Sequence, residues 1–363
     1  MINLKKGSEM KKKILYMSCH EILEFLEVSL LTELGYDVFS MGAYCNANQS
    51  GVSRPMIPGL KSHPPLGATY LQSSKENIHQ ELVDWADLIV MMHNSRVDVV
   101  DHPQPWLGST RINSQGRTGD NWEKLKKKLV VWRSIGQSTR TIEDALAPYR
   151  VQGLKIVRYS PKEKTIPNYC GEDTMIRFYG DENEFKDWNG KEPAVITIAQ
   201  SMKNRGEACN FKAFLAATEP FERRLFGYGN ENTGLIGGQL SYKALKKVLR
   251  DNRVYLFLGT QPACYTLNLI EAMMTGIPIV ALGKTFYKQF PDQETYEVPE
   301  IIKNGVNGFV GDDIGILREY IKLLFDDYEL AKKIGAEGRK TAIELFGKAK
   351  IKNQWKEFLG TIK

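Results

Sequence analysis

Short apolar runs alternate with amphipathic stretches along most of this chain. An apolar run of about four to eight residues is typical of a buried strand, whereas apolar residues three or four positions apart are typical of a helix. Between residues 21 and 34, for example, Ile22, Phe25, Leu26 and Leu30 form one apolar stripe that ends before Gly35. These patterns predict strands at 13–18, 37–40, 88–92, 129–132 and 154–159, with helices at 21–34 and 74–85.

The second half of the chain repeats this alternation of strands and helices. We predict strands at 194–199, 221–226, 254–258 and 279–282, and helices at 241–249, 266–274, 314–325, 329–346 and 348–359. Two such series predict an α/β fold of two Rossmann-like, doubly wound domains. The charged, glycine-containing stretch 181–192 is the predicted linker, which gives an N-terminal domain at 13–185 and a C-terminal domain at 186–345.

Three stretches show neither the strand pattern nor the helix pattern. Residues 46–65 and 101–121 are rich in proline, glycine or other small polar residues, so we expect long surface loops. Residues 1–12 are lysine-rich with few apolar side chains, which predicts a disordered basic tail.

The most informative stretch runs from residue 253 to 282 and contains a strand, a loop, a helix and a second strand. Gly259 and Pro262 lie in the loop, and Gly276 ends the helix. The helix is apolar nearly all round, which indicates burial, yet it contains Glu271. A buried carboxylate requires a partner because its desolvation is costly. That partner is either a ligand hydroxyl or a structural group of the protein.

Charge and cysteine content limit the function classes. Of the net charge of +6, five lysines against one glutamate within residues 1–13 supply +4, so the remaining chain gives little support for a general nucleic-acid surface. The five cysteines are scattered without a C-x-x-C pair, which argues against a zinc site or a disulfide framework. No apolar run approaches the roughly 20 residues of a membrane span, and the N-terminus lacks the apolar core of a secretory signal. We therefore expect a cytoplasmic protein.

The run NLIEAMMTGIPIVAL, followed by VPEIIKNGVNGFV, resembles the donor-binding half of the GT-B retaining glycosyltransferases of family 4. The resemblance covers about residues 194–359. It implies two Rossmann-like domains that face a cleft, with the last helix (346–363) crossing back onto the N-terminal domain. It also implies that Glu271 holds the ribose hydroxyls of a nucleotide sugar.

Residues 200–206 follow a predicted strand and match the family's phosphate site. Arg205 corresponds to the family's lysine, and Gln200 occupies the position of the family's arginine. The resemblance therefore implies that Arg205 and Lys203 stabilise the departing diphosphate; a solvated loop with two surface cations is the structural alternative. The family's second glutamate, eight residues before Glu271, is replaced by Ala263.

The remaining candidate site residues come from loops after strands. The resemblance implies that the glycine turn 227–229 is the loop that binds the nucleotide base. With the phosphate site and the start of the helix at 266–274, it gives these donor-binding candidates: Gln200, Ser201, Gly227, Tyr228, Gly229, Tyr265, Thr266, Leu267 and Asn268. On the N-terminal domain, side chains at three predicted strand ends form the expected acceptor side, and one of them, His93, is also a catalytic candidate: His20, Glu21, His93, Arg133 and Gln137. A single histidine is more often structural, but polar groups on three strand ends favour a site.

These features predict a retaining, metal-independent glycosyltransferase that moves a hexose, glucose first, from a UDP-linked donor. No D-x-D follows a predicted strand, so we expect no catalytic metal, and no cofactor besides the nucleotide-sugar co-substrate. The acceptor is a glycan, a lipid or modified DNA, and the protein a monomer or weak homodimer. The alternatives are a phage-type DNA glucosyltransferase acting on hydroxymethylated bases, a nucleotide-sugar epimerase and a non-catalytic nucleotide-sugar-binding module.

Overall fold

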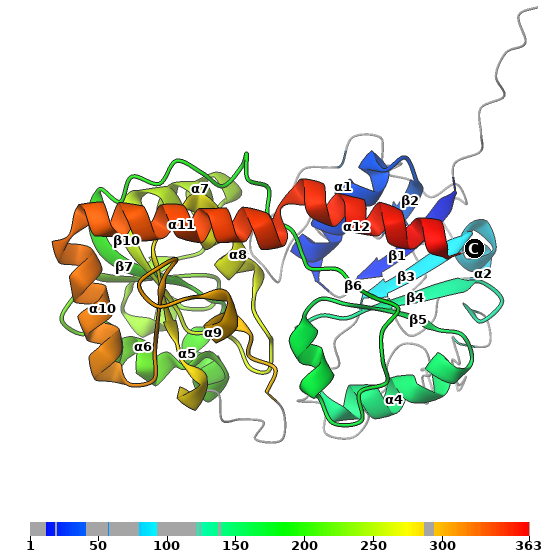
Figure 1. Cartoon of the computed structure of the whole chain (residues 1–363), viewed down its shortest axis with the longest axis horizontal. Coiled ribbons are helices and arrows are strands. Elements are labelled where there is room, and N and C mark those ends of the chain that lie inside the picture. The colour runs from blue at the N-terminus through cyan, green and yellow to red at the C-terminus, as the bar shows by residue number, and fades with distance from the viewer. Residues whose placement is uncertain are drawn as a thin grey trace, which may run out of the picture.

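Two separate parallel β-sheets of six strands each form the frame of the molecule. The computed structural model describes residues 12–18, 20–40, 57, 80–92, 122, 125–136, 139–286 and 294–362. The sheets lie side by side along the long axis, with helices on both faces of each (Figure 1). The prediction of two α/β units is therefore confirmed. The tail at 1–11, the start of the helix expected at 74–85 and, apart from Ile57, the loops at 46–65 and 101–121 lie outside the described residues.

The first sheet has the strand order β2-β1-β3-β4-β5-β6. Its strands are β1 (Lys13–Ser18), β2 (Asp37–Ser40), β3 (Leu88–Met92), β4 (Leu129–Arg133), β5 (Lys155–Arg158) and β6 (Thr174–Met175). Its helices are α1 (Glu21–Glu33), α2 (Gln80–Trp85) and α4 (Arg140–Val151). The order reverses between β1 and β3, which places a crevice at the carboxyl ends of these two strands.

The second sheet has the strand order β12-β11-β10-β7-β8-β9. Its strands are β7 (Glu192–Ile198), β8 (Arg223–Phe226), β9 (Ile236–Gly238), β10 (Asn252–Phe257), β11 (Ile279–Leu282) and β12 (Phe309–Gly311). The helices associated with it are α5 (Met202–Arg205), α6 (Phe211–Thr218), α7 (Tyr242–Asp251), α8 (Leu267–Thr275), α9 (Val298–Ile301), α10 (Ile314–Asp326) and α11 (Tyr328–Phe346). Here the order reverses between β7 and β10.

Both faces of each sheet are buried, which explains the continuous apolar runs in the sequence. In β1, Ile14 and Tyr16 belong to one hydrophobic cluster, and Leu15 and Met17 belong to another on the opposite face. The cluster that contains Ile14 extends through both sheets and into the contact between them. The two halves thus share one continuous apolar core.

The last helix, α12 (Lys348–Thr361), crosses from the second sheet back to the first (Figure 1). Lys348 and Lys352 pair with Glu33 of α1 at 2.8 and 3.0 Å, and Trp355 is fully buried. This confirms the predicted return crossing. We call the first sheet with its helices and α12 the first lobe, and the second sheet with α5–α11 the second lobe.

The helix α4 and several short elements are not among those predicted from the sequence. Helix α4 contains Pro148, a residue that usually ends a helix. Strands β6, β9 and β12 have only two or three residues, too few for a periodic pattern. Across the described parts of the chain, no helix is both long and apolar enough to cross a membrane.

Candidate functional site

The reversal between β7 and β10 predicts a ligand-binding crevice in the second lobe, at the carboxyl ends of these strands. The chain leaves β7 through residues 199–201 into α5, and it leaves β10 through residues 258–266 into α8. Glycine-rich residues 227–229 follow the neighbouring strand β8. All three loops were predicted to contribute to the site, and the topology brings them to the same edge of one sheet.

The loops after β7 and β8 touch through their backbones. A side chain on Gly227 would bring its Cβ within 2.3 Å of the Ala199 carbonyl oxygen, and one on Gly229 within 2.2 Å of Ser201 Oγ. Both glycines have positive φ angles, 120° and 79°. Ser201 itself adopts a left-handed conformation and donates its N–H to the Tyr228 carbonyl at 2.7 Å. Only glycine fits the two positions, so the two glycines are required for the close approach of the two loops.

Asn230 joins these two loops, and sequence reasoning missed it. Its carboxamide nitrogen donates to the carbonyls of Ala199 and Gly227 at 2.6 and 2.9 Å, and its oxygen accepts from the Met202 N–H at 2.8 Å. The side chain is buried. The asparagine directly after Gly-Tyr-Gly was the available signal, because an asparagine next to a turn commonly bonds its side-chain amide to nearby backbone.

The predicted cations lie on α5 and are exposed. The Arg205 guanidinium lies 3.5 Å from the Gln200 carbonyl oxygen, and the Lys203 ammonium donates to the Asn232 carbonyl at 3.2 Å. Tyr228, half exposed at 50%, lies in the loop that bonds to Ser201. Arg205 can therefore turn toward an anion, whereas Lys203 contacts the segment that follows the glycine loop.

The start of α8 is tied to the end of β7 by Asn268. Its carboxamide nitrogen donates to the Ile198 carbonyl, and its oxygen accepts from the Thr266 hydroxyl. Thr266 is the N-cap residue, with an extended backbone, and Leu267 begins the helix. Asn268 thus has a structural role besides its predicted donor contact, because it holds the first turn of α8 beside the β7 loop.

Glu271 occupies the middle of α8 and is only 6% exposed. It lies near Tyr255 of β10: burial raises the pKa of the Tyr255 phenol, and the Glu271 carboxylate raises it further. The Tyr255 hydroxyl lies 3.4 Å from the Ile198 nitrogen. The predicted acid therefore lies at the reversal between β7 and β10, close to the ends of both strands.

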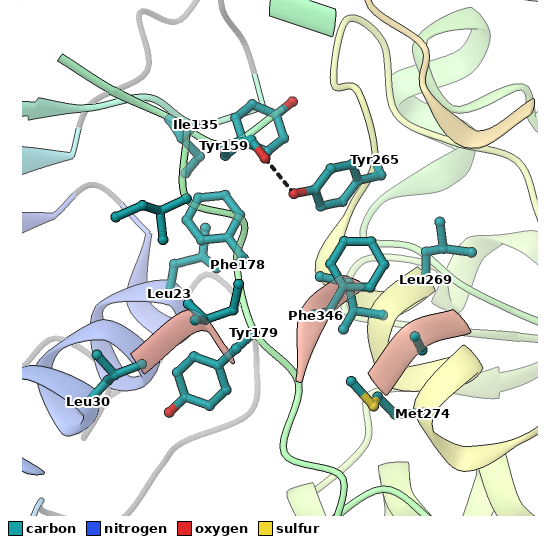
Figure 2. Close-up of a cluster of buried hydrophobic side chains, with 14 of the residues drawn as sticks. Leu23, Leu30, Ile135, Tyr159, Phe178, Tyr179, Tyr265, Leu269, Met274 and Phe346 are labelled. Atoms are coloured by element: carbon teal, nitrogen blue, oxygen red, sulfur yellow. Dashed lines mark hydrogen bonds between the residues drawn. The ribbon is translucent and has the colours of Figure 1, made fainter. Parts of the chain in front are cut away.

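Tyr265 corrects one prediction for the donor side. Its ring is buried, and its hydroxyl donates to the Tyr159 carbonyl of the first lobe at 2.7 Å (Figure 2). A side chain in this position has no free hydroxyl for a sugar or phosphate. Ala263, two residues earlier, is also buried; a Cβ on Gly136 of the first lobe would lie 2.8 Å from its methyl carbon.

His20 lies where predicted, directly after β1 at the reversal of the first sheet. It is the N-cap residue of α1, and its Nδ1 accepts the Leu23 N–H at 3.3 Å. Burial lowers the pKa of His20, and neighbouring Glu21 only partly offsets this. The neutral ring therefore carries its proton on Nε2, where it can donate a hydrogen bond but not accept a proton. Glu21 lies in the first turn of α1 and is half-buried.

Arg133 corrects a prediction for the acceptor side. It is fully buried, pairs with Glu27 at 2.8 Å, and donates to the Arg158 carbonyl at 3.1 Å. Its guanidinium lies 4.3 Å from the centre of the Phe178 ring and 5.7 Å from that of Trp355. The sequence placed it correctly at the end of β4, but the side chain points into the core, where no acceptor reaches it.

His93 and Gln137 lie outside the described residues. Within the described ranges, no group of three or more His, Cys, Asp and Glu side chains could hold a metal ion.

The assembled crevice combines an exposed cation, tight backbone loops, the N-terminus of α8 and a buried acid. Free N–H groups at a helix start, together with arginine, favour a phosphate group. A buried carboxylate favours hydroxyl groups. The second-lobe crevice therefore suits a ligand that carries both phosphate and sugar hydroxyls.

Known structures resemble the whole chain. HepE from Anabaena, solved in complex with UDP and glucose, superposes with a TM-score of 0.63 at 14% identity, over 97% of this chain and 100% of HepE. Sucrose-phosphate synthase from Thermosynechococcus elongatus gives 0.62 at 15% identity, over 96% and 98%. A glycosyltransferase from Rickettsia africae gives 0.64 at 12% identity, over 98% and 100%. No protein-family model and no curated protein matches the sequence.

These similar structures are GT-B glycosyltransferases, and they cover nearly the whole chain. The chain therefore has the GT-B fold, as the sequence predicted.

Proposed function

We propose that this protein is a retaining glycosyltransferase that transfers a hexose, glucose first, from a UDP-linked donor to an acceptor hydroxyl. The observation that carries the proposal is Glu271, a buried acid on α8 at the reversal between β7 and β10. The complex of HepE with UDP and glucose supports the choice of donor, because HepE shares the fold along its full length.

In this proposal the second lobe binds the donor. Glu271 accepts hydrogen bonds from the ribose hydroxyls, and the base lies against Gly227–Gly229 beside Tyr228. The diphosphate lies between the N–H groups at the start of α8 and the β7 loop. Arg205 moves onto the diphosphate as the bond to the sugar breaks, and its charge stabilises the leaving group. No metal ion is required, since arginine and helix N–H groups supply the positive charge.

The acceptor enters from the first lobe. His20 at the end of β1 presents a neutral ring whose Nε2–H can donate to an acceptor or sugar oxygen. Glycans, lipids and hydroxymethylated DNA each offer the required hydroxyl. A comparison of turnover with these three acceptor classes identifies the acceptor, and turnover of the sugar nucleotide without any acceptor would instead favour an epimerase.

The proposal is tested by replacing Glu271 with glutamine, which keeps the shape but removes the charge. Hydrogen bonds to a charged group contribute about 1.5–3 kcal/mol, so the affinity for UDP should fall roughly 10- to 150-fold. Isothermal titration calorimetry with UDP measures this. Glu344→Gln, which changes an exposed glutamate on α11, is the matched control and should bind UDP like the wild type. Equal affinity of Glu271→Gln and wild type, with the fold intact, would refute the ribose contact.

A further inference from the structure

The two lobes are joined by a buried polar contact that lies next to the proposed donor site. We call this contact the seam; it consists of Tyr159, Ser160 and Arg177 from the first lobe and Cys264, Tyr265 and Glu297 from the second. Tyr159 contributes two hydrogen bonds to the seam. The Tyr159 hydroxyl accepts the Cys264 N–H at 2.8 Å, and the Tyr159 carbonyl accepts the Tyr265 hydroxyl at 2.7 Å. Figure 2 shows the two tyrosines facing each other between the lobes.

Glu297 makes further polar bonds of the seam. Its carboxylate accepts from Ser160 Oγ at 2.5 Å and from both terminal nitrogens of Arg177, one of them at 3.0 Å. Its backbone N–H donates to the Cys264 carbonyl at 3.0 Å. Both backbone polar groups of Cys264 are therefore hydrogen-bonded: its N–H donates to the Tyr159 hydroxyl, and its carbonyl accepts from the Glu297 N–H.

These bonds fix a geometry more than they add stability. A buried ion pair gains little net free energy, because desolvation offsets its attraction, but a buried group left without its partner is strongly unfavourable. Arg177 and Glu297 are both buried, so the lobes can separate here only by exposing both charges. The seam therefore specifies one docking arrangement of the two lobes.

The position of the seam links this arrangement to the proposed reaction. Cys264 and Tyr265 directly precede Thr266, the N-cap residue of α8. The start of α8 is held independently to β7 by Asn268, so the proposed nucleotide contacts lie within the second lobe. What the seam fixes is the first lobe, with His20 at the end of β1, relative to the loop in front of α8.

We propose that Tyr159 is a positioning residue that fixes the first lobe against the loop preceding α8. Sugar transfer then depends on the Tyr159 hydroxyl, whereas nucleotide binding does not require it. This inference rests on the proposed function. A displacement of about 1 Å between reacting groups can lower a rate by about 100-fold, whereas a nucleotide held by one lobe would not sense it.

The test compares Tyr159→Phe with wild type in two measurements, the Kd for UDP by calorimetry and kcat for UDP release from UDP-glucose. We expect kcat to fall 10-fold or more while the Kd for UDP stays within twofold. Tyr265→Phe removes the other bond between the lobes at Tyr159, from the Tyr265 hydroxyl to the Tyr159 carbonyl, and should give the same split. Tyr179→Phe is the matched control: its hydroxyl donates to the Leu26 carbonyl within the first lobe, at 3.1 Å, and both values should stay within twofold of wild type.

Two results would overturn the inference. One is an unchanged kcat in Tyr159→Phe; the other is a Kd for UDP that rises by the factor by which kcat falls, as expected if the variants only loosen the second lobe. A wild-type protein that neither binds UDP nor releases it from UDP-glucose would overturn the proposed function, and this inference with it. If the wild type releases UDP from UDP-glucose and Tyr159→Phe does so at the same rate, this inference alone is overturned.

Discussion

Arg205 is an exposed cation that contacts the β7 loop in the proposed diphosphate site, and its effect on rate can be separated from its effect on binding. A charge that acts mainly on the leaving group affects the rate more than ground-state affinity. Arg205→Ala should therefore lower kcat by about 100-fold or more, on the scale of losing one preorganised donor. Arg205→Lys should recover part of this, because a lysine still supplies a point charge.

Steady-state kinetics with the best donor measures the effect of Arg205. Lys212→Ala, which removes an exposed lysine on α6, serves as a control for loss of charge and should retain the wild-type rate. If Arg205→Ala raised KM and left kcat unchanged, arginine would be a binding residue and the leaving group would be stabilised elsewhere.

His20 makes the stability of the first lobe depend on pH. Its folded-state pKa is lowered, chiefly by burial, so below the unfolded value of about 6.5 the unfolded chain binds more protons than the folded one. Stability from this residue is complete above that pH and is lost as the pH falls toward the folded pKa. Protonated Nδ1 also no longer accepts the Leu23 N–H.

We expect His20→Asn, which keeps a competent N-cap, to remove this dependence. Urea unfolding between pH 5 and 7 should show a wild-type stability that falls by up to about 1.4 kcal/mol per pH unit relative to the variant. The other histidines of the chain are common to both proteins and cancel in the difference. Parallel pH profiles would show that His20 does not carry the effect.

At the residue scale, the sequence predicted positions along the strands better than side-chain directions. Glu271 was found because an acid in an apolar helix is conspicuous without any structure. Arg133 and Tyr265 were placed in the correct loops, but both point into the core, where Glu27 and Tyr159 satisfy them. Those partners lie 106 residues away in the sequence, so no local pattern could identify them.

At the scale of elements, α11 packs on the end of α8 through glycine. A Cβ on Gly335 would lie 2.0 Å from the Gly276 carbonyl oxygen. This oxygen belongs to the backbone of the C-cap residue of α8, so it cannot shift as the end of a flexible side chain would. Gly335→Ala should therefore destabilise the protein by about 1–3 kcal/mol, the usual cost of overpacking. Gly360→Ala is the matched control, since nothing lies within 4 Å of its Cβ position.

The Gly360 control should be neutral or stabilise the protein by up to about 1 kcal/mol, because alanine favours a helix. Denaturant unfolding of the two variants measures both effects. Equal stabilities of Gly335→Ala and Gly360→Ala would contradict the close packing of α11 on α8.

Long elements were predicted well because their periodic patterns cover many residues. The strands from β1 to β11 that have four or more residues and the long helices α10–α12 all lie within a few residues of their expected ends. The short strands β6, β9 and β12 depend on neighbours in the sheet for their hydrogen bonds. Their pairing partners, rather than their own residues, determine them.

At the scale of the whole molecule, the last helix completes the core of the first lobe. Trp355 is fully buried, and the Arg133 guanidinium lies over its ring. Removing a buried tryptophan side chain costs about 3–5 kcal/mol, and here the loss falls on the first lobe. Trp355→Ala should therefore split the calorimetric unfolding transition into two, with the first lobe unfolding at the lower temperature.

Differential scanning calorimetry of Trp355→Ala and of Lys356→Ala, an exposed neighbour on the same helix, measures this difference. Lys356→Ala should unfold like the wild type. A single transition in Trp355→Ala, shifted as a whole, would mean that the lobes unfold as one unit even when α12 is weakened.

The return of α12 to the first lobe also determines when that lobe can finish folding in the cell. Its strands leave the ribosome first, yet the helix that covers them is made only after the entire second lobe. At about 5–20 residues per second, the interval between Met175 and Lys348 lasts on the order of ten seconds or more. During synthesis the nascent first lobe therefore exposes the surface that Trp355 later covers.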